Sequence, residues 1–471
     1  MMVAARTPAA AAQTITLTID IHLRVPADMP PALRRALIDR YTVPNPAYLE
    51  AVRYDRSTTD IDRHLRYWRA TPDGGLALPR GDAQAAFLLA QKYGLEVTWN
   101  NRTHLAPEVE FTQHLPLSAA QEQAVAQVLG KRMGVLVAPA GAGKTTMAMV
   151  AIARRRQPAL FLVHAGELAQ QALRAAERVL GLNPAEVGMI GGGRWSVGER
   201  LTIALVQSLQ GELPAELAAH VGHVVVDECH HAPADMFARV VAQLPARFLL
   251  GLSATPYRRD GLGQVINFYL GPIAATMHEG ALADRLIKPR VVKRETGINV
   301  YGASFTDLVS QLTNDSARNR LIVGDVAHAV AEGRRCLVLS DRIEHVELLT
   351  TLLQAEGLTA AALHGQKTKR QRAQVVADAS AGQLDVLVAT CALVGEGFDC
   401  PRLDALLLAT PISYEGRIVQ YIGRVSRTAP GKADAIVYDY VDGHPILWAS
   451  WRKRSVVYRE QRLSWSTLGP P

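Results

Sequence analysis

The chain has 471 residues, 48% of them hydrophobic, with a net charge of +7 and a pI of about 9.3. This length exceeds what one hydrophobic core usually holds, so we expect about three structural units, and the basic balance only weakly favours a polyanionic partner. No stretch approaches the ~20 apolar residues of a membrane span, and residues 1–13 lack the apolar core of a signal peptide, which predicts a cytoplasmic protein with no membrane partner. The four cysteines show no metal-binding spacing and are interpreted as core residues.

The first hundred residues have the pattern of a small α+β unit. Residues 15–25 alternate apolar and polar side chains, as in a half-buried strand. We expect helices over residues 31–41 and 82–93, a strand over 95–99, and a turn-rich stretch at 43–46. The charges of this unit nearly cancel, so no phosphate-binding face is evident in it.

From about residue 111, short apolar runs alternate with longer helical patterns. Fully apolar strands separated by helices indicate a parallel sheet covered on both faces. The pattern pauses near Ile287 and then resumes, so we predict two consecutive α/β lobes. The runs are 134–138, 160–164, 201–206, 224–226 and 248–252 in the first series, and 336–340, 386–390, 405–409 and 435–438 in the second.

The first of these runs leads into a glycine-rich loop that ends in a G-K-T sequence. Glycines let the backbone wrap closely around a phosphate at a helix N-terminus. Lys144 is expected to neutralise the β- and γ-phosphates of ATP, and the Thr145 hydroxyl to ligate Mg²⁺. Ala138 stands where the simplest form of this P-loop has glycine. The candidate ATP-binding residues are Gly141, Ala142, Gly143, Lys144, Thr145 and Thr146.

An acidic pair follows the apolar run at residues 224–226. Asp227 is expected to hold Mg²⁺, and Glu228 to orient or deprotonate the water that attacks the γ-phosphate. A solvated acidic turn is the alternative, but it would leave the preceding apolar run and the following His230 without a reason.

Phosphoryl transfer also requires positive charge on the γ-phosphate. Arg424 and Arg427 are three residues apart, which predicts that they share one helical face in the second lobe. An arginine supplied from a second lobe makes hydrolysis conditional on lobe closure. A surface helix also carries such arginines, so this feature is ambiguous by itself.

Taken in order, these blocks resemble those of superfamily 2 helicases over about residues 111–441. The resemblance implies two tandem RecA-like lobes and assigns Gln121 to the reading of adenine. It also implies residues that couple hydrolysis to movement, namely His230, Ser253, Thr255, Gly397, Asp399 and Gln420.

The wording of the blocks distinguishes between groups of these helicases. The box Asp227-Glu228-Cys229-His230 ends in His, whereas the DEAD-box RNA helicases have Asp there. With Gly191-Gly192-Gly193 it is similar to the XPB/UvsW-type DNA translocases, and the first hundred residues are similar to those of phage and mobile-element helicases. Arg259 replaces the middle acid of the R-E-D motif of XPB-like proteins, so this chain departs from their pattern at that position.

The resemblance also predicts a division into four parts. Residues 1–110 form an accessory domain suited to the recognition of DNA structure, 111–285 and 286–445 are the two RecA-like lobes, and 446–471 form a basic and aromatic helix or tail. The tail's Trp448, Trp451 and Tyr458 fit either base stacking or packing on the second lobe, and packing is favoured.

In this family the nucleic-acid strand crosses both lobes and is held mainly through its phosphates. Such contacts position the nucleic acid without recognising its base sequence. The residues assigned to these contacts by resemblance are Gln207, Ser208, Arg342, His364, Gly365 and Thr390. The basic run at 367–372 fits equally well a duplex guide and a solvated helix face.

The sequence therefore predicts an ATP- and Mg²⁺-dependent DNA helicase or double-strand translocase, with 3′-to-5′ polarity implied only by the family. The expected partner is duplex, forked or branched DNA in repair, recombination or phage replication, together with repair, replication or defence proteins. Three alternatives stay open: an RNA helicase, the motor subunit of a restriction or defence complex, and an ATP-gated DNA clamp that does not move.

Overall fold

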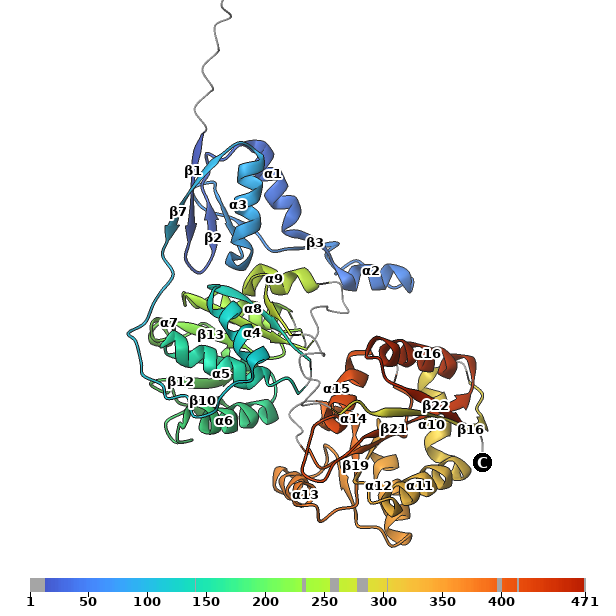
Figure 1. Ribbon diagram of the computed structural model, residues 1–471. Coiled ribbons are helices and arrows are strands. Elements are labelled where there is room, and N and C mark those ends of the chain that lie inside the picture. The colour runs from blue at the N-terminus through green and yellow to red at the C-terminus, as the bar shows by residue number, and fades with distance from the viewer. Residues whose placement is uncertain are drawn as a thin grey trace, which may run out of the picture. The chain divides into compact units, whose positions relative to one another are not determined.

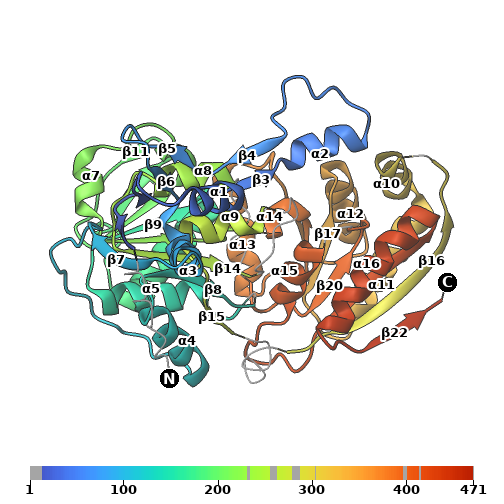
Figure 2. The ribbon, with the colours of Figure 1, turned by 90° about the horizontal axis from the view of Figure 1, so that it is seen from above.

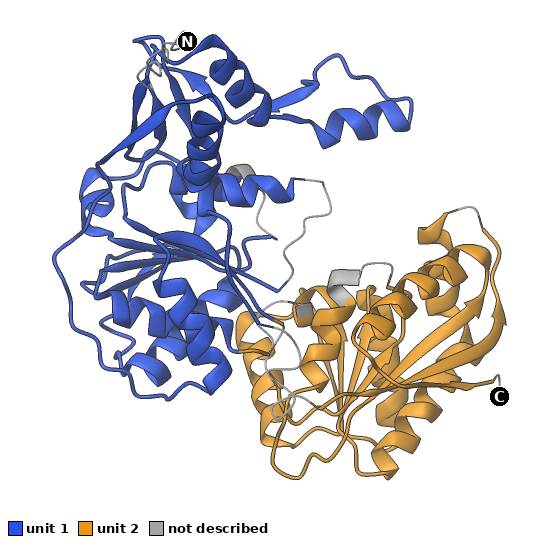
Figure 3. Cartoon of the chain, turned by 45° about the horizontal axis from the view of Figure 1, so that its top comes forward, with its two compact units in different colours: residues 1–138, 143–277 blue, residues 139–142, 278–471 orange. Residues whose placement is uncertain are grey.

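The structure is a computed structural model that describes residues 13–139, 141–230, 234–254, 262–277, 287–302, 304–395, 400–412 and 415–469. The chain divides into two compact units (Figure 3): unit 1 is residues 1–138 and 143–277, and unit 2 is residues 139–142 and 278–471. Each unit contains a mainly parallel sheet with helices around it (Figure 1), which confirms the predicted α/β class. The finer division into four domains stays a prediction.

Unit 1 begins with a small α+β fold, whose sheet among the described residues has five strands in the order β5-β6-β2-β1-β7. Its elements are β1 (Thr14–Ile19), β2 (Leu23–Val25), α1 (Pro31–Arg40), β5 (Arg69–Ala70), β6 (Leu76–Leu78), η1 (Arg80–Asp82), α3 (Ala83–Lys92) and β7 (Glu96–Asn101). The single strand predicted over 15–25 is wrong: β1 and β2 pair antiparallel around a turn in which Asp20 accepts the His22 N–H. The alternation continues across the turn because both strands turn the same alternate residues to the core.

Two short paired strands, with a helix between them in the sequence, extend from this fold. The strands β3 (Thr42–Pro44) and β4 (His64–Arg66) pair, and α2 (Pro46–Arg53) lies between them in the sequence. The sequence indicated only turns here. The helix begins because the Asn45 side chain accepts the Ala47 N–H at 3.0 Å and Pro46 occupies a first-turn position.

The rest of unit 1 is the first α/β lobe, with eight strands among the described residues in the order β11-β10-β12-β9-β13-β14-β8-β15. The strands are β8 (Met133–Val137), β9 (Ala159–Val163), β10 (Gly188–Gly191), β11 (Arg194–Trp195), β12 (Leu201–Leu205), β13 (His223–Val226), β14 (Phe248–Ser253) and β15 (Ile273–Thr276). The helices are α4 (Ala119–Leu129), α5 (Lys144–Arg155), α6 (Gly166–Leu180), η2 (Val206–Leu209), α7 (Ala215–His220), α8 (Ala234–Val241) and α9 (Gly263–Leu270). The pairing is parallel except between β10 and β11, as expected for fully apolar strands joined by helices.

Unit 2 is the second lobe, whose seven described strands are all parallel in the order β18-β19-β17-β20-β21-β16-β22. The strands are β16 (Arg290–Asn299), β17 (Cys336–Ser340), β18 (Ala360–Leu363), β19 (Val386–Thr390), β20 (Ala405–Leu408), β21 (Ile436–Gly443) and β22 (Trp465–Leu468). The helices are α10 (Phe305–Asn314), α11 (Ser316–Ala331), α12 (Ile343–Ala355), α13 (Lys369–Ala381), α14 (Cys391–Gly395), α15 (Glu415–Val425) and α16 (Pro445–Glu460). None of the helices in the described residues combines the length and apolar character that a membrane crossing requires.

The C-terminal segment packs onto this second lobe (Figure 2). The strand β22 extends the sheet beside β16, and α16 contacts β21. Trp448 and Trp451 are half-buried, and their rings lie 4.5 and 4.8 Å from the Lys293 Nζ. Tyr458 is buried and donates its hydroxyl to Asp439 at 2.7 Å. These contacts are those of the packing alternative rather than of rings presented to bases.

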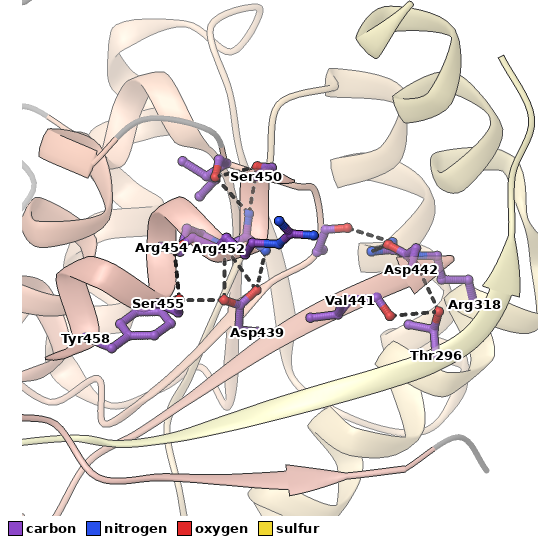
Figure 4. A network of polar contacts seen from close by, with 12 residues as sticks. Thr296, Arg318, Asp439, Val441, Asp442, Ser450, Arg452, Arg454, Ser455 and Tyr458 are labelled. Carbon is purple, nitrogen blue, oxygen red and sulfur yellow. Dashed lines mark hydrogen bonds and ion pairs between the residues drawn. The ribbon is translucent and has the colours of Figure 1, made fainter. Parts of the chain in front are cut away.

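Two arginine–aspartate pairs are buried inside this lobe (Figure 4). Arg454 donates through Nε and Nη2 to Asp439, and Arg318 donates through the same two nitrogens to Asp442. Each arginine also donates to a backbone carbonyl, Arg454 to Ile412 and Arg318 to Ala409. The pairs therefore hold α16 against the middle of β21 and α11 against its end.

A buried histidine in unit 2 makes the stability depend on pH. His345 is 2% exposed, with Nδ1 3.0 Å from Ser340 Oγ and Nε2 2.9 Å from Asn319 Oδ1. Burial, with a smaller contribution from the Arg318 charge, lowers its pKa to about 3 from 6.5. The folded state therefore binds fewer protons than the unfolded state between these two values, and its stability falls as the pH drops through 6.5.

We expect urea unfolding to show this dependence as a slope of up to about 1.4 kcal/mol per pH unit between pH 6 and pH 4. In a His345→Gln variant, which carries no titrating ring, the slope is expected to be smaller by about that amount, whatever its absolute stability. Equal slopes in the wild type and the variant would contradict the assignment of a neutral buried histidine.

Candidate functional site

The glycine-rich loop is shaped by backbone that only glycine adopts readily. Gly141 and Gly143 have φ of +81° and +80°, in the left-handed region. Gly143 precedes the first residue of α5 and gives this helix no side-chain cap. A Cβ at Gly143 would lie 2.6 Å from Gln121 Nε2. The loop thus leaves the N-terminus of α5 to be capped by a group from outside the helix, which suits a phosphate.

Lys144, the first residue of α5, connects this loop to the acidic pair. Its Nζ donates to the Ala138 carbonyl at 3.2 Å and lies 3.7 Å from Glu228 Oε1. Thr145 follows it half-buried in the first turn, and Thr146 is buried. The structure therefore brings together the lysine and the glutamate that the sequence separates by more than eighty positions.

Asp227 and Glu228 follow the end of β13. Asp227 is 6% exposed, and burial, together with the charge of Glu228, raises its pKa to about 7. The Glu228 N–H donates to Asp227 Oδ1 at 3.0 Å, and the backbone of Glu228 has φ of +45°. A left-handed conformation at a residue other than glycine or asparagine is strained, and such strain is concentrated at functional sites.

The box is tied to the next strand through its last residue. His230 is buried, and its Nδ1 lies 3.0 Å from Ser253 Oγ at the end of β14 and 3.5 Å from Glu228 Oε2. The two candidate coupling residues are thus in direct contact. The third one predicted in this lobe, Thr255, lies outside the described residues.

Gln121 is buried beside the glycine-rich loop. Ser118 and Gln121 form a capping box at the start of α4, in which the Gln121 Oε1 accepts the Ser118 N–H at 3.0 Å. The amide nitrogen of Gln121 lies so close to Gly143 that a side chain at that glycine would collide with it. The predicted role in reading adenine stays a prediction.

The candidate arginines of unit 2 differ from the expected arrangement. Arg424 is in the last turn of α15, but the helix ends at Val425, so the prediction that one helical face carries both Arg424 and Arg427 is wrong. The Ser426 hydroxyl donates to the Ile422 carbonyl, and Pro430 follows shortly, which does not allow the helix to continue. Both arginines are half-buried.

The other coupling residues predicted in unit 2 have different standing. Gln420 is buried on α15. Gly397 and Asp399 lie outside the described residues. Their role stays a prediction.

The six candidate nucleic-acid residues divide by exposure. Gln207 and Ser208 are exposed on η2, directly after β12, and Gly365 is exposed after β18. Arg342 is half-buried at the start of α12. His364 and Thr390 are buried, and His364 Nε2 contacts the Glu347 carboxylate. A buried side chain offers little surface to a nucleic acid, so the exposed residues are the stronger candidates.

Comparisons with known proteins agree with this arrangement. Residues 114–258 match the family described as "Type III restriction enzyme, res subunit", and residues 319–429 match "Helicase conserved C-terminal domain". A protein of Acanthamoeba polyphaga mimivirus, provisionally named an ATP-dependent RNA helicase, is 26% identical over 66% of this chain and 60% of its own length. The DNA 3′-5′ translocase XPB2 of Sulfurisphaera tokodaii is 29% identical over 37% of this chain and 38% of its own. This chain therefore belongs to the superfamily 2 helicases.

The helicase fold is also found in solved structures. A structure titled "S. cerevisiae Dbp5 bound to RNA and ADP BeF3" matches with a TM-score of 0.56 and 16% identity, over 75% of this chain and 90% of the other. At that identity the match shows the fold of the two RecA-like lobes alone. The chain spans about two fifths to three fifths of the length of the two curated relatives above.

Sequence reasoning missed two features of this helicase site. One is the backbone carbonyl of Ala138 as an acceptor for Lys144, and the other is the left-handed conformation of Glu228. Neither carries a side-chain signal, because both belong to the backbone.

Proposed function

We propose that this helicase is an ATP-driven translocase or helicase on DNA, acting on forked or branched duplexes. The observation that carries the proposal is the cluster of Lys144, Asp227 and Glu228 beside the glycine loop. Lys144, at the N-terminus of α5, lies 3.7 Å from Glu228, whose backbone is strained. A lysine that holds a triphosphate and a glutamate that directs a water at it are the groups that this hydrolysis needs.

The residues present fit ATP and Mg²⁺. The glycine loop leads into the N-terminus of α5, which has no side-chain cap, so the backbone N–H groups there fit the phosphates of ATP, and Lys144 supplies a positive charge. Within the described residues, no group of three or more His, Cys, Asp or Glu side chains is placed to hold a metal ion. Asp227 and Thr145 are the residues that would hold Mg²⁺, which would neutralise charge on the triphosphate.

The side chains around the glycine loop then have separate roles in ATP hydrolysis. Glu228 accepts a proton from, or orients, the water that attacks the γ-phosphate. His230 and Ser253 join the acidic pair to the end of β14, so a change at the phosphate reaches the next strand of the sheet. We propose that Arg424 and Arg427 stabilise the charge that develops on the γ-phosphate, which makes hydrolysis depend on the second lobe.

DNA is the track that the sequence favours. The box ends in His230 rather than the aspartate of DEAD-box RNA helicases, and the archaeal relative is named a DNA translocase. Contacts through exposed polar groups such as Gln207 and Ser208 suit a motor that releases and rebinds phosphates in each cycle. The name of the mimivirus relative favours RNA and makes an RNA helicase the second candidate. The four cysteines are buried core residues, and we propose a reducing, cytoplasmic location.

The choice of track is tested by the stimulation of ATP hydrolysis. We expect duplex and forked DNA to raise kcat by at least about tenfold more than single-stranded or duplex RNA of the same length. Lys144→Ala is the control that removes hydrolysis on every nucleic acid. Stronger stimulation by RNA would replace the proposal with the RNA candidate.

A further inference from the structure

The small α+β fold at the start of unit 1, residues 13–101, is built into the first lobe rather than tethered to it. One hydrophobic cluster runs through both, from Leu17 and Leu37 on one side to Phe237 and Phe268 on the other. The connection beyond it is also attached, since Ala106 exchanges hydrogen bonds with the buried Gln157 side chain. This accessory fold therefore moves with the lobe that carries the glycine loop.

Arg80 is the polar centre of the junction. It is 2% exposed, and its guanidinium donates to the Asp20 carbonyl at 2.9 Å in the accessory fold and to the Leu244 carbonyl at 2.8 Å just after α8. In the described part of the structure its Nε has no hydrogen-bond partner. Burial lowers its pKa to about 10, which reflects the cost of placing this cation between carbonyl groups. A charge kept at such a cost indicates a requirement for the link that it makes.

Gly81, the residue after Arg80, allows the accessory fold and the first lobe to approach closely. A Cβ at Gly81 would lie 2.6 Å from the Gly271 nitrogen and the Tyr269 carbonyl carbon, both in backbone at the end of α9. The rings of Tyr41 and Tyr67 lie 4.9 and 5.7 Å from that of Phe268 on α9. The Leu78-Pro79-Arg80-Gly81 segment thus docks the accessory fold onto α9.

The two helices held at this junction are those that continue from the ATP site. The helix α8 is the next element after Asp227–His230, and α9 is the next after β14, which ends at Ser253. The two helices also meet each other, with the rings of Phe237 and Tyr269 6.4 Å apart. The accessory fold is thus attached to α8 and α9, which follow along the chain the two residues that meet at the His230–Ser253 contact.

We propose that Arg80 is a positioning residue for ATP hydrolysis: it fastens the accessory fold to α8 and α9 and so sets the placement of Glu228 and His230. This inference rests on the proposed ATPase function. The hydrogen bonds of Arg80 go neither to the glycine loop nor to α5, which begins with Lys144. Loss of the link is therefore expected to lower kcat, which depends on the placement of Glu228, and to leave the KM for ATP nearly unchanged.

The test compares two methionine variants of the full-length protein. Arg80→Met keeps the buried volume and loses both bridging hydrogen bonds. Arg34→Met is the matched control, because Arg34 also donates to a backbone carbonyl, that of Gly74, but within the accessory fold. In DNA-stimulated ATP hydrolysis we expect Arg80→Met to lower kcat about three- to tenfold with KM within twofold, Arg80→Lys to recover part of it, and Arg34→Met to match the wild type.

Thermal unfolding shows whether each variant is folded, and so distinguishes a positioning role of Arg80 from a role in stability alone. A folded Arg80→Met protein with the kcat of the wild type would overturn the inference. If Arg80→Met does not fold, Phe268→Leu supplies the same readout, since it keeps an apolar side chain and removes the contacts with Tyr41 and Tyr67; a wild-type kcat there is equally contrary. Absence of hydrolysis in the wild type itself would overturn the proposed function, and this inference with it.

Discussion

Glu228→Gln is expected to lower kcat for DNA-stimulated ATP hydrolysis by about 10²- to 10³-fold while ATP still binds. The amide keeps the size of the carboxylate but does not accept a proton from the attacking water. Lys144 and the glycine loop, which hold the triphosphate, are unchanged, although the neighbouring Lys144 Nζ loses a charged partner at 3.7 Å. The measurement is steady-state ATPase kinetics together with equilibrium binding of a fluorescent ATP analogue.

A control distinguishes chemistry from local folding. Glu177→Gln changes an exposed glutamate on α6, in the same lobe, and is expected to leave kcat within twofold of the wild type. Retention of more than about a tenth of the activity in Glu228→Gln would show that this glutamate does not act on the water. Loss of both binding and hydrolysis would indicate a misfolded site, which circular dichroism would reveal.

Arg454→Met is expected to lower the free energy of unfolding of this helicase by about 3–5 kcal/mol. The substitution leaves the Asp439 carboxylate, which is fully buried, with the Tyr458 hydroxyl but without the guanidinium that donates to it (Figure 4). Arg452→Met, an exposed position on the same helix, is expected to change stability by less than about 0.5 kcal/mol. Chemical denaturation followed by circular dichroism measures both values.

We attribute this loss of stability to the Asp439 charge that is left buried without its arginine, rather than to lost packing. The double variant Arg454→Met with Asp439→Leu removes the charge left behind and is expected to recover more than half of the loss. If the double variant is less stable than Arg454→Met alone, the effect comes from packing of α16 on the sheet, and the assigned cause is incorrect.

Much of the fold was predictable because the central strands are uniformly apolar. The runs at 134–138, 160–164 and 386–390 correspond to β8, β9 and β19 to within a residue at either end. A parallel strand buried on both faces has no polar positions to obscure it. Edge strands such as β11 and β22 were missed because they are short and exposed, so their sequences carry no comparable pattern.

The candidate ATP site was predicted from sequence motifs. Motifs do not show the role of a residue that lies outside them in the sequence. Lys144, Asp227 and Glu228 were found because the chemistry of phosphoryl transfer restricts residue type and order. Arg80 was not, because an arginine is normally exposed and its partners at Asp20 and Leu244 are distant along the chain. The roles of the nucleic-acid residues stay predictions for a related reason: the family assigns them by position, while their contacts depend on a strand that only a complex contains.

The central claim, ATP-driven movement along DNA, is tested most directly by displacement of a triplex-forming strand from duplex DNA. We predict that the wild-type protein displaces the third strand in the presence of ATP and Mg²⁺, and that Glu228→Gln, which binds ATP without turning it over, does not. ATP hydrolysis by the wild type without displacement of the third strand would contradict the account and favour a clamp that binds DNA without moving.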